Sequence, residues 1–152
     1  MDPNLDLVLE RHIRAAPADV WRAWTERDLL LQWFTPAPWR MVDALIEPRP
    51  GGRFHTRMAG PAGEDVASDG CILAAEPGRL LTFTDALGPG WRPAVTPFMT
   101  AIVTMEPDGG GTAYRARALH ATPEARARHE AMGFQAGWSA AADQMEALLA
   151  GG

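Results

Sequence analysis

The sequence predicts an α+β protein in which an antiparallel sheet of about six or seven strands fills the middle of the chain and a long helix forms its C-terminal part. Three observations predict this class. Apolar and polar residues alternate along several segments between residues 5 and 120, turns rich in glycine and proline separate these segments, and residues 134–148 carry an apolar stripe with helical spacing. Strands that follow one another through short turns favour an antiparallel meander.

The first part of the chain predicts a strand followed by two short helices. Residues 5–14 alternate in hydropathy as a half-buried strand does. Pro17 stands where proline is favoured, in the first turn of a helix. Thr25 and Asp28 have the spacing of a capping box, which predicts the start of the second helix, and the prolines within residues 35–38 end it.

The middle of the chain predicts strands separated by turns and one loop. The predicted strands are residues 40–47, 53–58, 66–75, 80–85, 98–106 and 112–120. The sequence DGGG at residues 108–111 is the clearest hairpin signal in the chain. The sequence PRPGG at residues 48–52 predicts a turn, and the glycines and prolines of residues 87–97 predict a loop.

The C-terminal part predicts an amphipathic helix. Thr122 is a favourable N-cap and Pro123 a favourable first residue. The apolar stripe consists of Phe134, Trp138, Ala141, Met145 and Leu148. One continuous helix over residues 123–149 would be about 40 Å long, which is the full diameter of a domain of this size. Gly133 and Gly137 therefore favour a break or kink near residue 132.

Composition narrows the class of function. The length of 152 residues fits a single domain covering residues 1–152. The formal net charge of −5 argues against nucleic acid or an anionic membrane surface as a partner. Every basic side chain is arginine, and the absence of lysine excludes both a Schiff-base lysine and a phosphate-binding P-loop.

The sequence favours a cytoplasmic protein. Its one cysteine, Cys71, cannot form an internal disulfide. The N-terminal sequence MDPNLDLVLE lacks the basic region of a signal peptide, and no apolar run reaches the roughly 18–20 residues of a membrane span. We therefore expect no membrane partner, and a homodimer stays open.

Four segments carry a resemblance to a known family. They are APADVWRAWTERDLLLQWFTP at residues 16–36, EPRPGGRF at 47–54, GGGTAYRARALH at 109–120 and HEAMGFQAGWSAAADQMEALL at 129–149. In this order they resemble the helix-grip fold of the START-like (SRPBCC, Bet v-like) superfamily, and within it the bacterial branch similar to the C-terminal domain of the activator of the heat-shock protein 90 ATPase. The resemblance spans about residues 7–149. It implies a curved antiparallel sheet that grips the long helix, with an apolar cavity between them.

The resemblance does not imply one reaction, because this fold hosts transporters, cyclases, hydrolases and co-chaperones. We expect a module that binds a small apolar or amphipathic molecule, without a cofactor. Two alternatives stay open: a cyclase, hydratase or hydrolase that uses His120 and His129, and an interaction domain that activates a chaperone ATPase. The eukaryotic activator carries a separate N-terminal chaperone-binding domain, for which this chain has no room, and this counts against a chaperone partner.

Strand alternation predicts the walls of the cavity. Within residues 112–120 the arginines take one face, so Tyr114 and His120 face the helix, and Ala116 and Ala118 leave space there. The predicted ligand-binding residues are Phe54, Met58, Trp91, Phe98, Tyr114, His120, His129, Phe134 and Trp138, with Trp91 in a loop beside the mouth of the cavity. The same residues would also suit a filled core, and this alternative stays open.

His120, His129 and Glu130 are the polar candidates for catalysis. His120 ends an inward-facing strand and His129 lies in the helix that returns over it, so we expect the two imidazoles to be neighbours. Glu130 points about 100° away from His129 around the helix, so the two do not easily share one target. The alternative is that one histidine bridges sheet and helix. We expect no metal, because zinc spacings such as HExxH or paired CxxC are absent.

Overall fold

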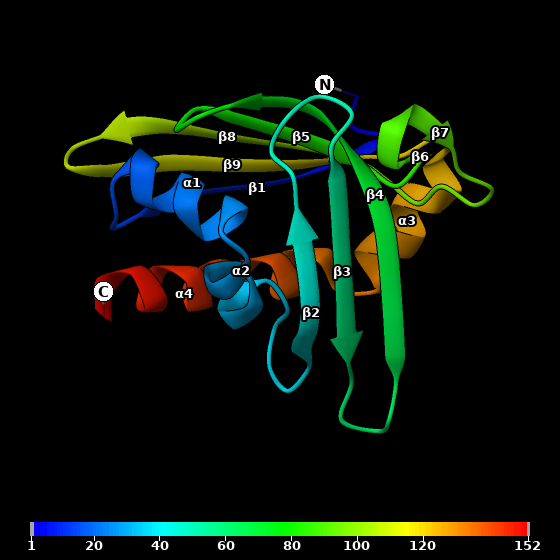
Figure 1. Ribbon diagram of the computed structural model, residues 1–152, viewed down its shortest axis with the longest axis horizontal. Helices are drawn as coiled ribbons and strands as arrows, with labels where there is room; N and C mark the ends of the chain where they lie inside the picture. The colour runs from blue at the N-terminus through cyan, green and yellow to red at the C-terminus, as the bar shows by residue number, and fades with distance from the viewer. Residues whose placement is uncertain (1, 152) are drawn as a thin grey trace.

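Seven strands form one antiparallel sheet in the computed structural model, which describes residues 2–151 (Figure 1). The strands are β1 (Asp6–Ile13), β2 (Arg40–Ile46), β3 (Arg53–Ala59), β4 (Asp65–Glu76), β5 (Leu80–Thr84), β8 (Thr100–Asp108) and β9 (Gly111–Leu119). Their order across the sheet is β1-β9-β8-β5-β4-β3-β2. The predicted fold class is confirmed, and every predicted strand lies within two residues of an observed one at both ends.

Four helices accompany this sheet within residues 2–151: α1 (Pro17–Thr25), α2 (Arg27–Trp33), α3 (Pro123–Ala131) and α4 (Phe134–Gly151). Figure 1 shows β2, β3 and β4 turned steeply away from β1, β8 and β9, so that the curved sheet wraps around α4. Helices α1 and α2 both pack against α4. The helix-grip architecture that the resemblance implied is therefore present.

The segment predicted as a loop, residues 87–97, contains a short hairpin. Strands β6 (Leu87–Gly88) and β7 (Arg92–Pro93) pair with each other around the 3-10 turn η1 (Pro89–Trp91). The hairpin brings Trp91 over the turn at residues 48–52, where Gly51 has a φ of 81°. A Cβ atom at Gly51 would lie 2.7 Å from the indole nitrogen of Trp91, so only glycine allows the ring this close.

The β8–β9 hairpin shows how the sequence fixes the register of the sheet. Gly109 and Gly110 form the turn with φ angles of 56° and 88°, the two left-handed positions of a type I′ turn. Asp108 pairs with Gly111, and the register continues so that Tyr114 lies opposite Met105. Tyr114 is 3% exposed, which confirms that it faces inward. The predicted hairpin signal is confirmed.

Of the two predicted helix caps, the one at α3 is confirmed and the one at α2 is wrong. At α3 the side chain of Thr122 accepts a hydrogen bond of 3.1 Å from the amide of Ala125, so the predicted N-cap is confirmed. At α2 the predicted capping box is wrong. The hydroxyl of Thr25 donates backwards to the carbonyl of Trp21 at 2.8 Å, because Thr25 still belongs to α1, and Glu26 is the N-cap without a side-chain bond.

The C-terminal helix is broken where the glycines predicted. Gly133 separates α3 from α4 and has a φ of 93°. After the break α4 turns its apolar stripe inward: Phe134, Ala141 and Met145 are buried, and Trp138 and Leu148 are partly buried against the core.

Two polar side chains anchor α4 to the rest of the fold. Gln144 donates to the carbonyls of Trp33 and Thr35, both at 2.9 Å, and accepts from the amide of Ala37 at 2.9 Å. Glu146 accepts from the amide of Arg14 at 2.8 Å and from the guanidinium of Arg11 at 3.2 Å. These contacts lower the pKa of Glu146, led by the backbone bond from Arg14. They hold the helix against β1 and against the segment that follows α2.

The α3–α4 break yields a test of backbone strain. We expect Gly133→Ala to lower the free energy of unfolding by about 1–2 kcal/mol, because alanine is strained at this left-handed φ. Gly137→Ala is the matched control inside α4, where an added Cβ meets Pro36 at an ordinary 3.9 Å. It should raise stability by up to about 1 kcal/mol. Urea unfolding measures both, and equal effects would show that Gly133 does not set the break.

Candidate functional site

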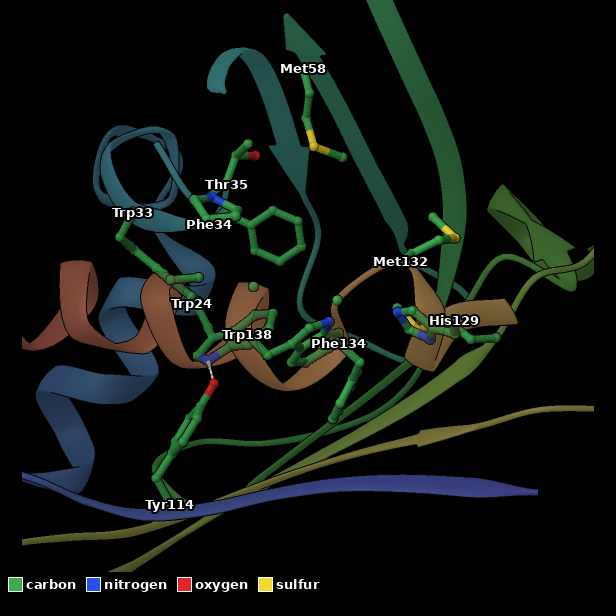
Figure 2. Close-up of a pocket in the computed structure, with 15 residues that line it drawn as sticks. Trp24, Trp33, Phe34, Thr35, Met58, Tyr114, His129, Met132, Phe134 and Trp138 are labelled. Atoms are coloured by element: carbon green, nitrogen blue, oxygen red, sulfur yellow. Dashed lines mark hydrogen bonds between the residues drawn. The ribbon is translucent and has the colours of Figure 1, made fainter. Parts of the chain in front are cut away.

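A pocket of about 300 Å³ lies between α4, the segment after α2 and the sheet (Figure 2). It is lined by Trp24, Trp33, Phe34, Thr35, Pro36, Met58, Met99, Tyr114, His129, Met132, Gly133, Phe134, Gly137, Trp138 and Ala141. Figure 2 shows His129 and Met132 at one end and Trp33 towards the other. Helices, strands and loops thus each contribute part of the wall.

The structure brings some of the predicted ligand-binding residues to this pocket. Met58, Tyr114, His129, Phe134 and Trp138 line it. They come from β3, β9, α3 and α4, the elements from which the prediction took them. Their role as ligand contacts stays a prediction.

Four predicted residues lie elsewhere, for distinct physical reasons. Phe54 stacks on Phe83 with ring centroids 4.4 Å apart, as part of the core. The rings of Phe98 and His129 pack with centroids 4.6 Å apart, but Phe98 does not line the pocket. His120 is hydrogen-bonded to His129 and does not line the pocket either. Trp91 is 49% exposed and covers Gly51 instead of the mouth of the pocket.

The expected space over β9 is also placed differently. Ala116 and Ala118 are fully buried and do not line the pocket. The small residues that do line it are Gly133, Gly137 and Ala141 on the helical side. The pocket volume therefore results from these small residues at the start of α4 and within it, and not from Ala116 and Ala118 of β9.

Sequence reasoning missed the wall contributed by α1, α2 and the loop after them. Trp24, Trp33 and Phe34 form an aromatic cluster, with centroid distances of 4.9 Å between the two indoles and 5.5 Å from Trp24 to Phe34. Trp24 donates to the hydroxyl of Tyr114 at 3.2 Å, and Trp33 donates to the carbonyl of Ala23 at 2.9 Å. Both indole N–H groups are therefore paired within the protein. The aromatic content of residues 21–34 was the available signal.

The two histidines meet as expected. Nε2 of His120 lies 2.8 Å from Nδ1 of His129, and Nδ1 of His120 lies 2.8 Å from the carbonyl oxygen of Leu5. His129 is 7% exposed and His120 6% exposed. Glu130, the third catalytic candidate, is exposed and pairs with Arg126 at 3.5 Å. It does not line the pocket, because it points away from His129 around the helix.

The polar groups of the pocket are uncharged at neutral pH. Burial, together with the neighbouring His120, lowers the pKa of His129 to about 4. Burial raises the pKa of Tyr114 above its ordinary value. The hydroxyl oxygen of Thr35 is buried and has no hydrogen-bond partner among residues 2–151. The pocket thus offers neutral donors and acceptors on mainly apolar walls.

Other chemistry has less support in the described part of the chain. Among residues 2–151 no group of three or more His, Cys, Asp or Glu side chains is placed to hold a metal ion. Cys71 is buried in β4, and Ser139 lies within α4. None of the helices described is long and apolar enough to cross a membrane.

Comparisons with known proteins show the family and the fold of the chain. The family model described as activator of Hsp90 ATPase homolog 1-like protein matches residues 14–150. Protein NE0264 from Nitrosomonas europaea is 42% identical and superposes with a TM-score of 0.95, over 98% of this chain and 96% of that one. No curated protein matches the chain.

Two further solved structures extend the likeness. A protein from Rhodobacter sphaeroides is 25% identical with a TM-score of 0.85, over 99% of this chain and 96% of that one. The AHSA1-like protein from Aeromonas hydrophila is 21% identical with a TM-score of 0.71, over 93% and 90% of the two chains, and shows the fold alone.

The low pKa of His129 predicts a pH dependence of stability. The unfolded chain binds a proton at this histidine below about pH 6.5, whereas the folded protein does so only near pH 4. The contribution is therefore complete above about pH 6.5 and is lost as the pH falls towards 4. Because the imidazole borders the pocket, we expect a loss of about 1–2 kcal/mol.

Urea unfolding from pH 7 to pH 4.5 measures this loss against His129→Gln, which does not titrate. The wild type should lose more stability than the variant over this range, since carboxylates titrate alike in both. Parallel pH profiles would contradict the lowered pKa.

Proposed function

The chain belongs to the family of activator of Hsp90 ATPase homolog 1-like proteins, and on this premise we propose that it binds a small apolar or amphipathic molecule in the pocket beside α4. The observation that carries the proposal is a pocket of about 300 Å³ with aromatic and methionine walls, bordered by the unpaired hydroxyl of Thr35. This volume lies at the lower end of the range for ligand sites, and such walls are typical of them. The ligand is accordingly small.

The buried hydroxyl of Thr35 supports a ligand in this pocket. A buried polar atom without a partner costs about 1–3 kcal/mol, so most proteins pair such atoms. Thr35 is 7% exposed, lines the pocket, and keeps its hydroxyl oxygen unpaired within residues 2–151. A polar atom of a ligand would supply the missing bond. The amphipathic class of ligand follows from this group and from the histidine at the other end.

The α3–α4 break offers an entrance. Met132 lines the pocket and is 69% exposed, and it is followed by the left-handed Gly133. A flexible, unbranched methionine at an exposed rim can move without disturbing the core. We place the route of the ligand between Met132 and the start of α4.

Binding is better supported than catalysis at the histidine pair. A general base works best when its pKa lies near the working pH. With a pKa of about 4, His129 is a weak base at neutral pH, although it is a good hydrogen-bond acceptor. The cyclase, hydratase or hydrolase alternative would need a second group to activate water or substrate, and Glu130 lies outside the pocket. The chaperone-activating alternative is supported by the name of the family alone.

Filling the pocket tests the proposed function. Ala141 lines the pocket, and Ala147 is an exposed residue of the same helix. We expect the wild type and Ala147→Leu to retain a small molecule in native mass spectrometry after mild purification, or to bind members of an apolar metabolite library. Ala141→Leu should lose at least about tenfold in affinity, because its side chain occupies ligand volume. Equal binding by both variants would place the ligand elsewhere.

Thr35→Val separates stability from binding. The change removes the unpaired hydroxyl and keeps the shape, so the ligand-free protein should gain about 0.5–2 kcal/mol while affinity for a polar-ended ligand falls. Thr112→Val is the contrasting control, because its hydroxyl donates to the carbonyl of Ala15 at 2.6 Å. It should destabilise the protein. Thermal unfolding reports both, and a loss of stability in Thr35→Val would show that its hydroxyl is already paired.

A further inference from the structure

The hydrogen bonds around the histidine pair determine which nitrogen carries each proton. A carbonyl oxygen only accepts, so Nδ1 of His120 donates to Leu5 across their 2.8 Å contact. In the neutral ring Nε2 of His120 is then an acceptor, and Nδ1 of His129 must donate to it across 2.8 Å. Both rings are therefore held in the Nδ1–H form. Nε2 of His129 is left with a lone pair and no proton.

No hydrogen bond to this lone pair is seen within residues 2–151. His129 lines the pocket, and the only hydrogen bond of its imidazole ring seen within residues 2–151 joins Nδ1 to His120. The ring is held in place by Phe98 and Phe134, at centroid distances of 4.6 and 5.2 Å. A fixed acceptor therefore borders the pocket, and its orientation is set by the end of β9, by α3 and by the residue before β1.

No formal charge accompanies this acceptor. The fifteen lining residues include no Arg, Asp or Glu, and their titratable members are Tyr114 and His129. A carboxylate or an ammonium group placed here would lose its hydration without gaining a counter-charge. A carboxylate would also meet the lone pair of His129 with a second acceptor. A neutral O–H or N–H group suffers neither penalty.

We propose that the ligand is uncharged and mainly apolar, and that it carries a neutral hydrogen-bond donor, such as a hydroxyl group, which donates to Nε2 of His129. This inference rests on the proposed function, because it specifies the ligand of the same pocket. The donor completes a chain that runs from the ligand through His129 and His120 to the carbonyl of Leu5. Each hydrogen bond in such a chain polarises the next, so Nε2 of His129 is a stronger acceptor than the same atom of an isolated imidazole.

This series of hydrogen bonds also explains why the pocket would select a ligand with a donor group. A ligand of the same shape without a donor would cover Nε2 of His129 and leave it unpaired, and buried unpaired acceptors are costly. We therefore expect about tenfold or greater preference for the donor. Methylation of a ligand hydroxyl, which removes the donor and adds bulk, should be rejected.

Three naphthalene probes test the inference by calorimetry at pH 7: 2-naphthol, which donates, 2-methoxynaphthalene, which only accepts, and 2-naphthoate, which is charged. The wild type should prefer 2-naphthol by about tenfold or more over either of the others. His129→Leu should bind 2-naphthol and 2-methoxynaphthalene with nearly equal affinity. The matched control His12→Leu, whose ring lies outside the pocket beside Asp108, should keep the wild-type preference.

The outcomes separate the two proposals. Equal affinity of the wild type for 2-naphthol and 2-methoxynaphthalene overturns the inference and leaves the proposed function intact. Tightest binding of 2-naphthoate overturns the uncharged class. Binding of none of the probes, in a protein whose Ala141→Leu variant also behaves like the wild type, contradicts both.

A measurement on the wild type alone covers the case in which His129→Leu fails to fold. Proton–nitrogen correlation spectra of the histidine rings report which nitrogen is protonated. We expect Nδ1–H in both rings, and a change of the Nε2 signal of His129 when 2-naphthol is added. A proton on Nε2 of His129 in the ligand-free protein would overturn the inference.

Discussion

The consecutive helices α3 and α4 pack on the concave side of a strongly curved sheet, and polar contacts at the two ends of this helix pair determine where it can lie. Near its C-terminal end Gln144 and Glu146 bind backbone groups of the loop after α2 and of the end of β1. At the other end the bond from His129 to His120 ties α3 to the end of β9. These contacts are partly or fully buried, and they favour one arrangement because a shift would leave polar groups unpaired.

The pocket follows from this fixed position. Between its anchored ends the helical side presents Gly137 and Ala141 where larger side chains would reach the sheet. The helix cannot move inward to close the gap, since Gln144 spans the carbonyls of Trp33 and Thr35 and would lose both bonds. Close packing is otherwise the rule for protein interiors. A gap held open by rigid anchors is therefore a feature that this fold maintains.

Much of the fold, but only part of the site, could be predicted from the sequence. Hydropathy alternation and the glycine turn at 109–110 are local signals, and they predicted the strands and the β8–β9 hairpin. The meeting of His120 and His129 followed from the topology alone. Thr35 could not be predicted, because its place depends on the distant bond from Gln144. Trp91 was misplaced for a related reason, since its partner is a glycine about forty residues earlier that no periodicity reveals.

The distribution of charge gives the site its character. The ion pairs of Arg11 and Arg14 with Glu146 lie at the far end of α4, and Glu130 pairs with Arg126 on the outer side of α3. Charge is thus used to position the helices from outside, while the pocket holds neutral groups. Burial keeps His129 neutral. A protonated imidazole donates from both ring nitrogens, whereas a neutral one donates from one nitrogen and accepts a hydrogen bond at the other. The same desolvation that makes His129 a poor base therefore makes it a selective acceptor.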